Sequence, residues 1–175
     1  MRFPGLVLPL AGAVAMTGCS SLVSLNPFVT DPDAVLDPAL AGVWSGDNGD
    51  ATYVIRQDGR GYAITYVEKS EAIRFQAKLM KAGEAELMDL VSADDNAFQL
   101  PVHTMVRVWP GGNSVRFAFL DSDWLREQAA KQLATTQTGD RTLITAPGDA
   151  ARSFLLKCGV DEKAYGKAEV VERVQ

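Results

Sequence analysis

Hydrophobic and polar residues alternate with a period of two along most of the chain after Ala41. Because successive side chains of a strand point to opposite faces, this alternation predicts β-strands with one buried face. The first strand begins near Gly42. The same pattern predicts further strands at 51–57, 61–67, 71–80, 85–91, 102–109, 114–120, 141–145 and within 167–174.

Short turns separate most of these segments. Asp58-Gly59-Arg60 and Pro110-Gly111-Gly112-Asn113 are typical hairpin turns. Consecutive strands joined in this way are antiparallel neighbours. A long meander with one apolar face closes or curls, because closure buries that face and hides the edges. The sequence therefore predicts a mainly β fold, an up-and-down lipocalin-like barrel or curved half-barrel of about eight strands.

Two short helices are predicted in the C-terminal part. Asp121 or Ser122 can cap the first helix, and the second fits between Pro147 and Gly159. The apolar face of the second helix comprises Ala151, Phe154, Leu155 and Cys158. We expect the thiol of Cys158 to be buried and inert on that face. We also expect the two helices to plug or cover an open end of the barrel.

The first residues follow a different pattern. Arg2 precedes a run from Phe3 to Met16 that carries no charge and ends in small residues, as in a secretory signal. A membrane-spanning helix needs about 20 apolar residues, and this run is shorter and contains Pro4 and Pro9. We therefore interpret residues 1–18 as a signal peptide.

Met16-Thr17-Gly18-Cys19 resembles the lipobox of bacterial lipoproteins. The resemblance implies cleavage after Gly18 and lipidation of Cys19, by a diacylglyceryl group and a further acyl chain such as palmitate. It also implies that the protein meets the membrane through this anchor. Ser20 stands where an aspartate would retain a lipoprotein in the inner membrane, which favours the outer membrane, facing the periplasm. The alternative is an ordinary secretory signal with a chance cysteine.

Residues 19–38 are predicted to be a lipidated tether, followed by one β-rich domain at 39–175. The tether has three prolines, each preceded by Asn or Asp, and no periodicity. Fully extended, it would reach about 60–70 Å. Its apolar residues could instead lie on the lipid surface or on the domain: Leu22, Val23, Leu25 and Phe28.

Composition narrows the possible functions. The chain carries 17 basic and 22 acidic residues and no block of lysine or arginine, so nucleic acid is not an expected partner. Catalytic signatures such as Gly-x-Ser-x-Gly or a phosphate-binding glycine loop do not occur, and no serine can be matched with a base. We expect a protein that is not an enzyme, and no metal site.

Gly42-Val43-Trp44, on the first predicted strand, resembles the Gly-x-Trp signature of lipocalins and related calycins. The resemblance implies a barrel with Trp44 packed across its closed end and a small apolar ligand inside. Other lipocalin motifs, among them a late arginine packed on the tryptophan, are not evident in the sequence. The continuation to Gly46 is also similar to haem-binding nitrobindin barrels.

Aromatic residues are interleaved along the predicted strands and provide candidates for a ligand site. They are either core residues or the lining of an aromatic pocket for an apolar or amphipathic ligand. The candidate ligand-binding residues are Trp44, Tyr62, Tyr66, Phe75, Phe117 and Phe119, with Tyr53 and Trp109 in the same pattern. The alternative function is a protein-interaction or envelope-assembly accessory with a packed core. In size and fold plan the chain is also similar to the open-barrel lipoprotein-sorting receptor of the outer membrane.

His103 is the only histidine. It shares a strand face with Met105, Arg107 and Trp109. An inward face would allow His103 to bind haem, the one cofactor alternative that we weigh. An outward face would make it a surface residue, and we favour this because burying Arg107 without a partner is costly.

Overall fold

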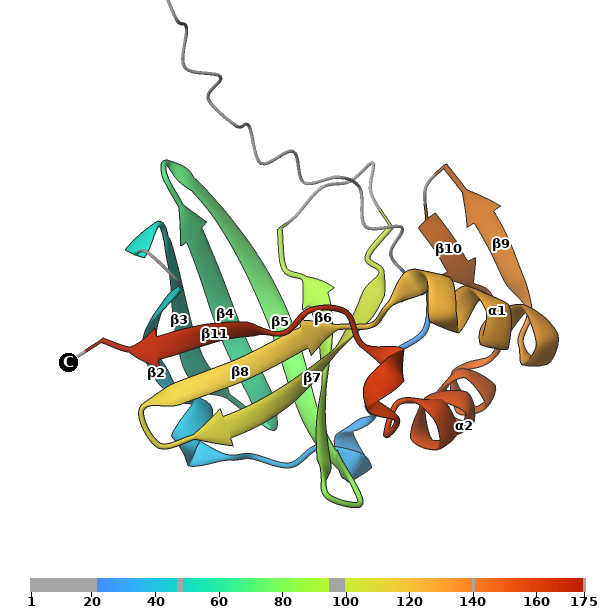
Figure 1. The fold of residues 1–175 in the computed structure, drawn as a ribbon, viewed down its shortest axis with the longest axis horizontal. Coiled ribbons are helices and arrows are strands. Elements are labelled where there is room, and N and C mark those ends of the chain that lie inside the picture. Colours follow the sequence, from blue (N-terminus) through green and yellow to red (C-terminus); the bar gives the residue numbers. More distant parts are fainter. Residues whose placement is uncertain (1–21, 47–48, 95–99, 140, 175) are drawn as a thin grey trace, which may run out of the picture.

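Eight antiparallel strands form a closed barrel in the computed structural model, which describes residues 22–46, 49–94, 100–139 and 141–174 (Figure 1). The predicted signal peptide and Cys19 lie outside the described residues. The barrel strands are β2 (Gly42–Gly46), β3 (Ala51–Asp58), β4 (Gly61–Glu68), β5 (Glu71–Ala82), β6 (Ala85–Ser92), β7 (His103–Gly111), β8 (Ser114–Phe119) and β11 (Glu169–Arg173). The predicted antiparallel barrel is confirmed.

Neighbours in sequence are neighbours in the barrel from β2 to β8, and β11 closes it. β11 pairs antiparallel with β8 on one side and with β2 on the other. The ladder between β6 and β7 is also complete, from Glu86↔Val108 to Val91↔His103. The alternation along the strands sorts the side chains: Leu79 and Met88 pack inside the barrel, whereas Met80 and Leu87 join a second cluster outside it.

Three further strands extend the sheet beyond the barrel. They are β1 (Leu22–Ser24), β9 (Thr135–Thr138) and β10 (Arg141–Ile144). β1 runs parallel to β10 and meets the start of β7 through Ser24↔His103. The sequence pattern predicts β10 but neither β1 nor β9.

The segment from β1 to the barrel packs on the barrel wall. Phe28 and Val29 are fully buried, and the Val35 amide donates to the Leu79 carbonyl across 2.8 Å. A short 3-10 helix, η2 (Pro38–Leu40), then leads into β2 with Leu40 buried beneath the barrel. Of the apolar residues in this segment, Leu22, Val23 and Phe28 are buried against the domain, whereas Leu25 is 40% exposed.

The helices α1 (Ser122–Gln132) and α2 (Gly148–Cys158) lie beside the outer wall of the barrel (Figure 1). Asp121 caps α1, since its side chain accepts from the amides of Asp123 and Trp124 at 2.9 and 3.0 Å. Cys158, at the end of α2, is half-buried, and burial raises the pKa of its thiol.

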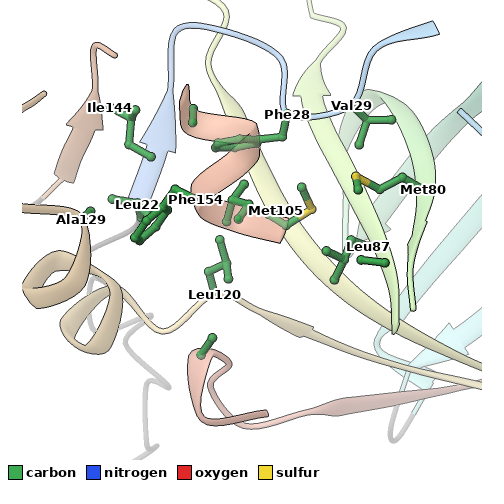
Figure 2. Packing of buried hydrophobic residues seen from close by; sticks show 14 of the residues in the cluster. Leu22, Phe28, Val29, Met80, Leu87, Met105, Leu120, Ala129, Ile144 and Phe154 are labelled. Carbon is green, nitrogen blue, oxygen red and sulfur yellow. The ribbon is translucent and has the colours of Figure 1, made fainter. Parts of the chain in front are cut away.

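The expectation that the helices plug an open end of the barrel is wrong. Leu87 and Met105 project outward from β6 and β7 and form one cluster with Phe154 of α2 and Ala129 of α1 (Figure 2). The physical reason is that β6 and β7 carry large apolar side chains, Leu87 and Met105, on their outer faces as well as on their inner faces. Without a cover, the outer face would expose these side chains to water, so the helices are needed there.

Candidate functional site at the open end of the barrel

Inside the barrel, the side chains of one half are fully buried and those of the other half are only partly buried, and these are named here the packed half and the open half. In the packed half, next to η2, the side chains of Trp44, Tyr62 and Leu79 have no exposed surface. The strand register places Trp44 opposite Tyr53 of β3 and Arg173 of β11. No ligand can touch residues so completely enclosed in this arrangement, so the packed half is structural.

Arg173 covers the packed half of the barrel. Its guanidinium lies over the ring of Trp44 at 4.1 Å from the centroid and donates to the carbonyls of Ala39 at 2.6 Å and Ala41 at 3.0 Å. The Trp44 indole donates to the Leu40 carbonyl at 3.0 Å. A Cβ on Gly42 would overlap the guanidinium, which explains why a glycine stands two residues before the tryptophan.

Tyr62 ties the same end to the segment before β2. Its hydroxyl accepts from the Asp37 amide at 2.7 Å and donates to the Asp37 carbonyl at 3.1 Å. Burial raises the pKa of the Tyr62 phenol. Both hydrogen bonds are satisfied within the protein, so Tyr62 has a structural role here.

Aromatic side chains line the open half, and several remain partly exposed. The ring centroids of Tyr53 and Tyr66 are 5.0 Å apart, and those of Tyr53 and Phe117 are 5.7 Å apart. Phe119 stacks edge-on against Phe117 and keeps 48% of its surface exposed. Phe75 of β5 is half-buried, and the register places it opposite Ile64 of β4. These five residues, Tyr53, Tyr66, Phe75, Phe117 and Phe119, are named here the aromatic mouth.

Carboxylates border the aromatic mouth. The Tyr66 hydroxyl donates to Glu68 across 2.5 Å. Burial, together with the negative charges of Glu68 and Glu169, raises the pKa of Tyr66 to about 12. Burial first, and then Glu169, also raises the pKa of Tyr53 above its ordinary value. The mouth therefore combines an apolar lining with neutral phenols and an acidic edge, which suits an amphipathic molecule better than a purely apolar one.

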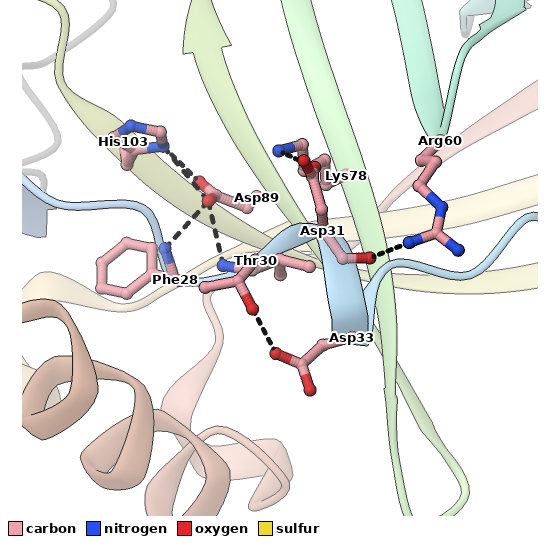
Figure 3. Close-up of polar contacts among 9 residues, drawn as sticks. Phe28, Thr30, Asp31, Asp33, Arg60, Lys78, Asp89 and His103 are labelled. Atoms are coloured by element: carbon pink, nitrogen blue, oxygen red, sulfur yellow. Dashed lines mark hydrogen bonds and ion pairs between the residues drawn. The ribbon is translucent and has the colours of Figure 1, made fainter.

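His103 lies on the outer wall, as the favoured interpretation predicts, yet it is not a free surface residue. Its Nδ1 is 3.0 Å from Oδ1 of Asp89, whose residue surface is only 4% exposed (Figure 3). Asp89 also accepts from the amides of Phe28 at 2.9 Å and Val29 at 3.2 Å. This polar cluster holds the N-terminal segment on β6, and its place outside the barrel separates His103 from the aromatic mouth.

A second group of polar contacts fastens the short helix η1 (Asp31–Asp33) to the same wall (Figure 3). Lys78 of β5 lies 2.6 Å from the Asp31 carboxylate and lowers the pKa of that group. Arg60 donates to the Asp31 carbonyl at 3.1 Å. Among the residues that the structure describes, no group of three or more potential metal ligands comes together.

The structure thus separates the six candidate ligand-binding residues. Tyr66, Phe75, Phe117 and Phe119 gather at the open end with Tyr53, whereas Trp44 and Tyr62 lie in the packed half. Trp109 lies outside the barrel, where Arg116 stacks on its ring at 4.4 Å. Sequence reasoning missed Arg173 and Asp89. The sequence does contain a signal for Arg173, because it follows Val171 by two residues and so falls on the same inward face of the strand.

Comparison with protein-family models finds no matching family, and comparisons with curated proteins and with solved structures also find no match. The site must therefore be interpreted from its own geometry. Within the described part of the chain, neither α1 nor α2 nor any other helix has the length and apolar character needed to cross a membrane.

Proposed function

We propose that this protein is a lipid-anchored binding protein of the bacterial cell envelope that holds an apolar or amphipathic ligand in the aromatic mouth. The main support is the partly exposed aromatic lining inside one end of a closed barrel. There the ring of Phe117 makes edge-on contacts with Tyr53 on one side and Phe119 on the other. In a soluble barrel, large apolar side chains on the inner face are normally covered, so their exposure supports a binding role.

The ligand would enter only part of the barrel. Trp44 and Tyr62 fill the other half completely, so the depth available is limited to the level of Phe75 and Phe117. A single acyl chain or a small ring system suits a shallow site of this kind. The acidic edge at Glu68 and Glu169 favours a ligand whose polar group is neutral or positively charged.

The anchor is proposed from the residues before the described part. Met16-Thr17-Gly18-Cys19 supports lipidation of Cys19, and Ser20 supports sorting to the outer membrane. Two or more acyl chains hold a protein stably on a bilayer. Incorporation of radiolabelled palmitate, together with loss of membrane fractionation in Cys19→Ala, would support this. A Cys19→Ala protein that fractionates like the parent would refute it.

Ligand binding is tested on the protein purified from its own cells. Mass spectrometry of an organic extract should detect a bound lipid or other apolar compound in about stoichiometric amount. The same preparation should bind the uncharged probe N-phenyl-1-naphthylamine with a rise in its fluorescence. An extract without such a compound and a probe signal no higher than with denatured protein would refute the binding role.

A groove outside the barrel favours a second candidate function, protein interaction. The groove has a volume of about 530 Å³, lies between the β5–β6 turn and α2, and is lined by Ala85, Arg107, Leu156 and Val160 among others. Leu156 and Val160 are 37% and 41% exposed. A photo-crosslinker at Leu156 should then capture one envelope protein reproducibly in cells, and a Val160→Asp change should abolish that product.

A further inference from the structure

We propose that the open end of the barrel faces the lipid bilayer and touches it, so that the aromatic mouth opens onto the membrane surface. This inference rests on the proposed lipidation of Cys19. It goes beyond the anchor because it assigns an orientation and a contact surface to the folded domain. Its partner is a zwitterionic lipid surface, and its evidence is the length of chain before β1 and the chemistry of the two barrel ends.

The chain between the anchor and the fold is very short. Leu22 is the first residue of β1, is 1% exposed and pairs with Thr142 of β10. Cys19 precedes Leu22 by three residues, which span at most about 10 Å when fully extended. A lipid on Cys19 therefore holds the membrane surface close to Leu22, and the domain cannot hang far from the bilayer.

β1 meets the barrel nearer to the open end than to the packed end. The Ser24↔His103 pair sets β1 beside the first residue of β7, and β7 then runs through nine residues to Gly111 at the other end. At about 3.3 Å per residue, β7 covers roughly 26 Å. Within the described residues β1 meets β7 through this pair alone, because Leu120 takes the next position and donates to the Met105 carbonyl at 3.3 Å. Cys19 precedes Ser24 by five residues, which span at most about 18 Å, so the anchor can reach the plane of the open end but not the packed end.

The open end also presents the apolar side chains that a bilayer would accept. Ile73 of β5, Leu100 before β7 and Phe119 at the end of β8 are 39%, 76% and 48% exposed. They come from three separate segments. Exposed apolar side chains contributed by several segments to one end of a barrel support an interaction surface there.

The turns at the packed end are different in character. They comprise Asp58-Gly59-Arg60, Gly83-Glu84 and Gly112-Asn113, all exposed and all without a large apolar side chain. Leu36, Val43 and Val174 are also exposed near this end, at 43%, 40% and 52%. Val43 and Val174 adjoin the inward Trp44 and Arg173 and so lie on the outer wall, and Leu36 lies in the segment before η2. The reach of the anchor, and not apolar exposure alone, therefore distinguishes the two ends. At the open end, Glu68 and Glu169 carry negative charge, so the surface that fits is zwitterionic rather than strongly anionic.

The orientation is tested with the lipidated full-length protein in a Cys158→Ser background. A nitrobenzoxadiazole fluorophore is placed at the open end through Leu100→Cys or at the packed end through Gly112→Cys. A Cβ at Gly112 meets no atom within 4 Å, so this control tolerates labelling. The proteins are reconstituted into phosphatidylethanolamine and phosphatidylcholine vesicles that contain headgroup nitroxide lipids.

We expect nitroxide lipids to quench the Leu100→Cys label at least twofold more than the Gly112→Cys label. In unlabelled protein, deuterium exchange at 71–75 should slow on vesicles while exchange at 111–114 stays unchanged. Equal quenching, or stronger quenching at Gly112→Cys, in a protein that co-floats with vesicles would overturn the orientation alone. A protein whose mass shows no lipid and that does not co-float would overturn both the anchor and the orientation.

Discussion

Arg173 stacks on Trp44 with its guanidinium 4.1 Å from the ring centroid, and this contact joins the last barrel strand to the first. The same guanidinium holds two carbonyls of the segment that leads into β2, at Ala39 and Ala41. One side chain thus combines barrel closure, coverage of the packed half and fixation of η2.

We expect Arg173→Ala to lower the free energy of unfolding by about 2–3 kcal/mol, because it removes a cation–π contact and two charged hydrogen bonds. Urea denaturation measures this loss. Arg173→Lys should recover only part of it, since an ammonium cannot bridge both carbonyls while stacking. Arg56→Ala, an exposed arginine on β3, is the control and should change stability by less than about 0.5 kcal/mol. Equal losses for both alanine variants would contradict this role.

Asp89→Asn should release the N-terminal segment from the barrel wall. The carboxylate accepts from Phe28, Val29 and His103, whereas an asparagine offers one acceptor oxygen and a competing donor. We expect a loss of about 2–3 kcal/mol in unfolding free energy and faster hydrogen exchange at the Phe28 and Val29 amides.

The matched control for Asp89 is Asp94→Asn. Asp94 is an exposed carboxylate that lies 3.9 Å from Arg74, so its loss should cost no more than about 0.5 kcal/mol. If the Phe28 and Val29 amides stayed protected in Asp89→Asn, the carboxylate would not be the group that holds this segment.

Alkaline pH should destabilise the fold partly through Tyr66. Its pKa is about 12 in the folded protein against an ordinary value of 10.0, because burial and the neighbouring carboxylates disfavour the phenolate. The stabilisation from this group is complete below pH 10 and is lost as the pH rises through about 12. Tyr66→Phe should therefore show a shallower fall in unfolding free energy over that range. An unchanged slope would count against the raised pKa.

Phe119→Ser separates ligand binding from stability. Phe119 is 48% exposed, so we expect the substitution to change unfolding free energy by less than about 1 kcal/mol while weakening N-phenyl-1-naphthylamine binding several-fold. Leu156→Ser in the groove beside α2, also partly exposed, should leave probe binding unchanged. The reverse result would move the binding site from the aromatic mouth to that groove.

The strand order follows from the sequence because alternation and short turns are local properties. β5 shows this well: Ala77 and Leu79 pack inside, and Lys78 between them lies outside against Asp31. The cap of α1 at Asp121 is local too, since it depends only on the amides that directly follow. Features of this kind need no knowledge of distant contacts.

The wrong placement of the helices has a cause visible in β6. Leu87 and Met88 are adjacent and both buried, so both faces of the strand require a cover. A prediction that assumes only one buried face for each strand misses the need for this second cover. The contacts of Asp89 with Phe28 and of Arg173 with Trp44 join residues far apart in the chain, and alternation assigns only a face, never a partner.

Closure of the barrel by β11 has a consequence for how the chain reaches its final form. Until β11 docks, β2 and β8 each present a bare row of backbone donors and acceptors to the surroundings. β11 comes from very late in the sequence, so closure of the barrel depends on contacts between residues far apart in the chain, which form slowly. During folding, the vulnerable species is therefore a barrel that still lacks β11, and self-association is the main risk until Arg173 reaches Trp44.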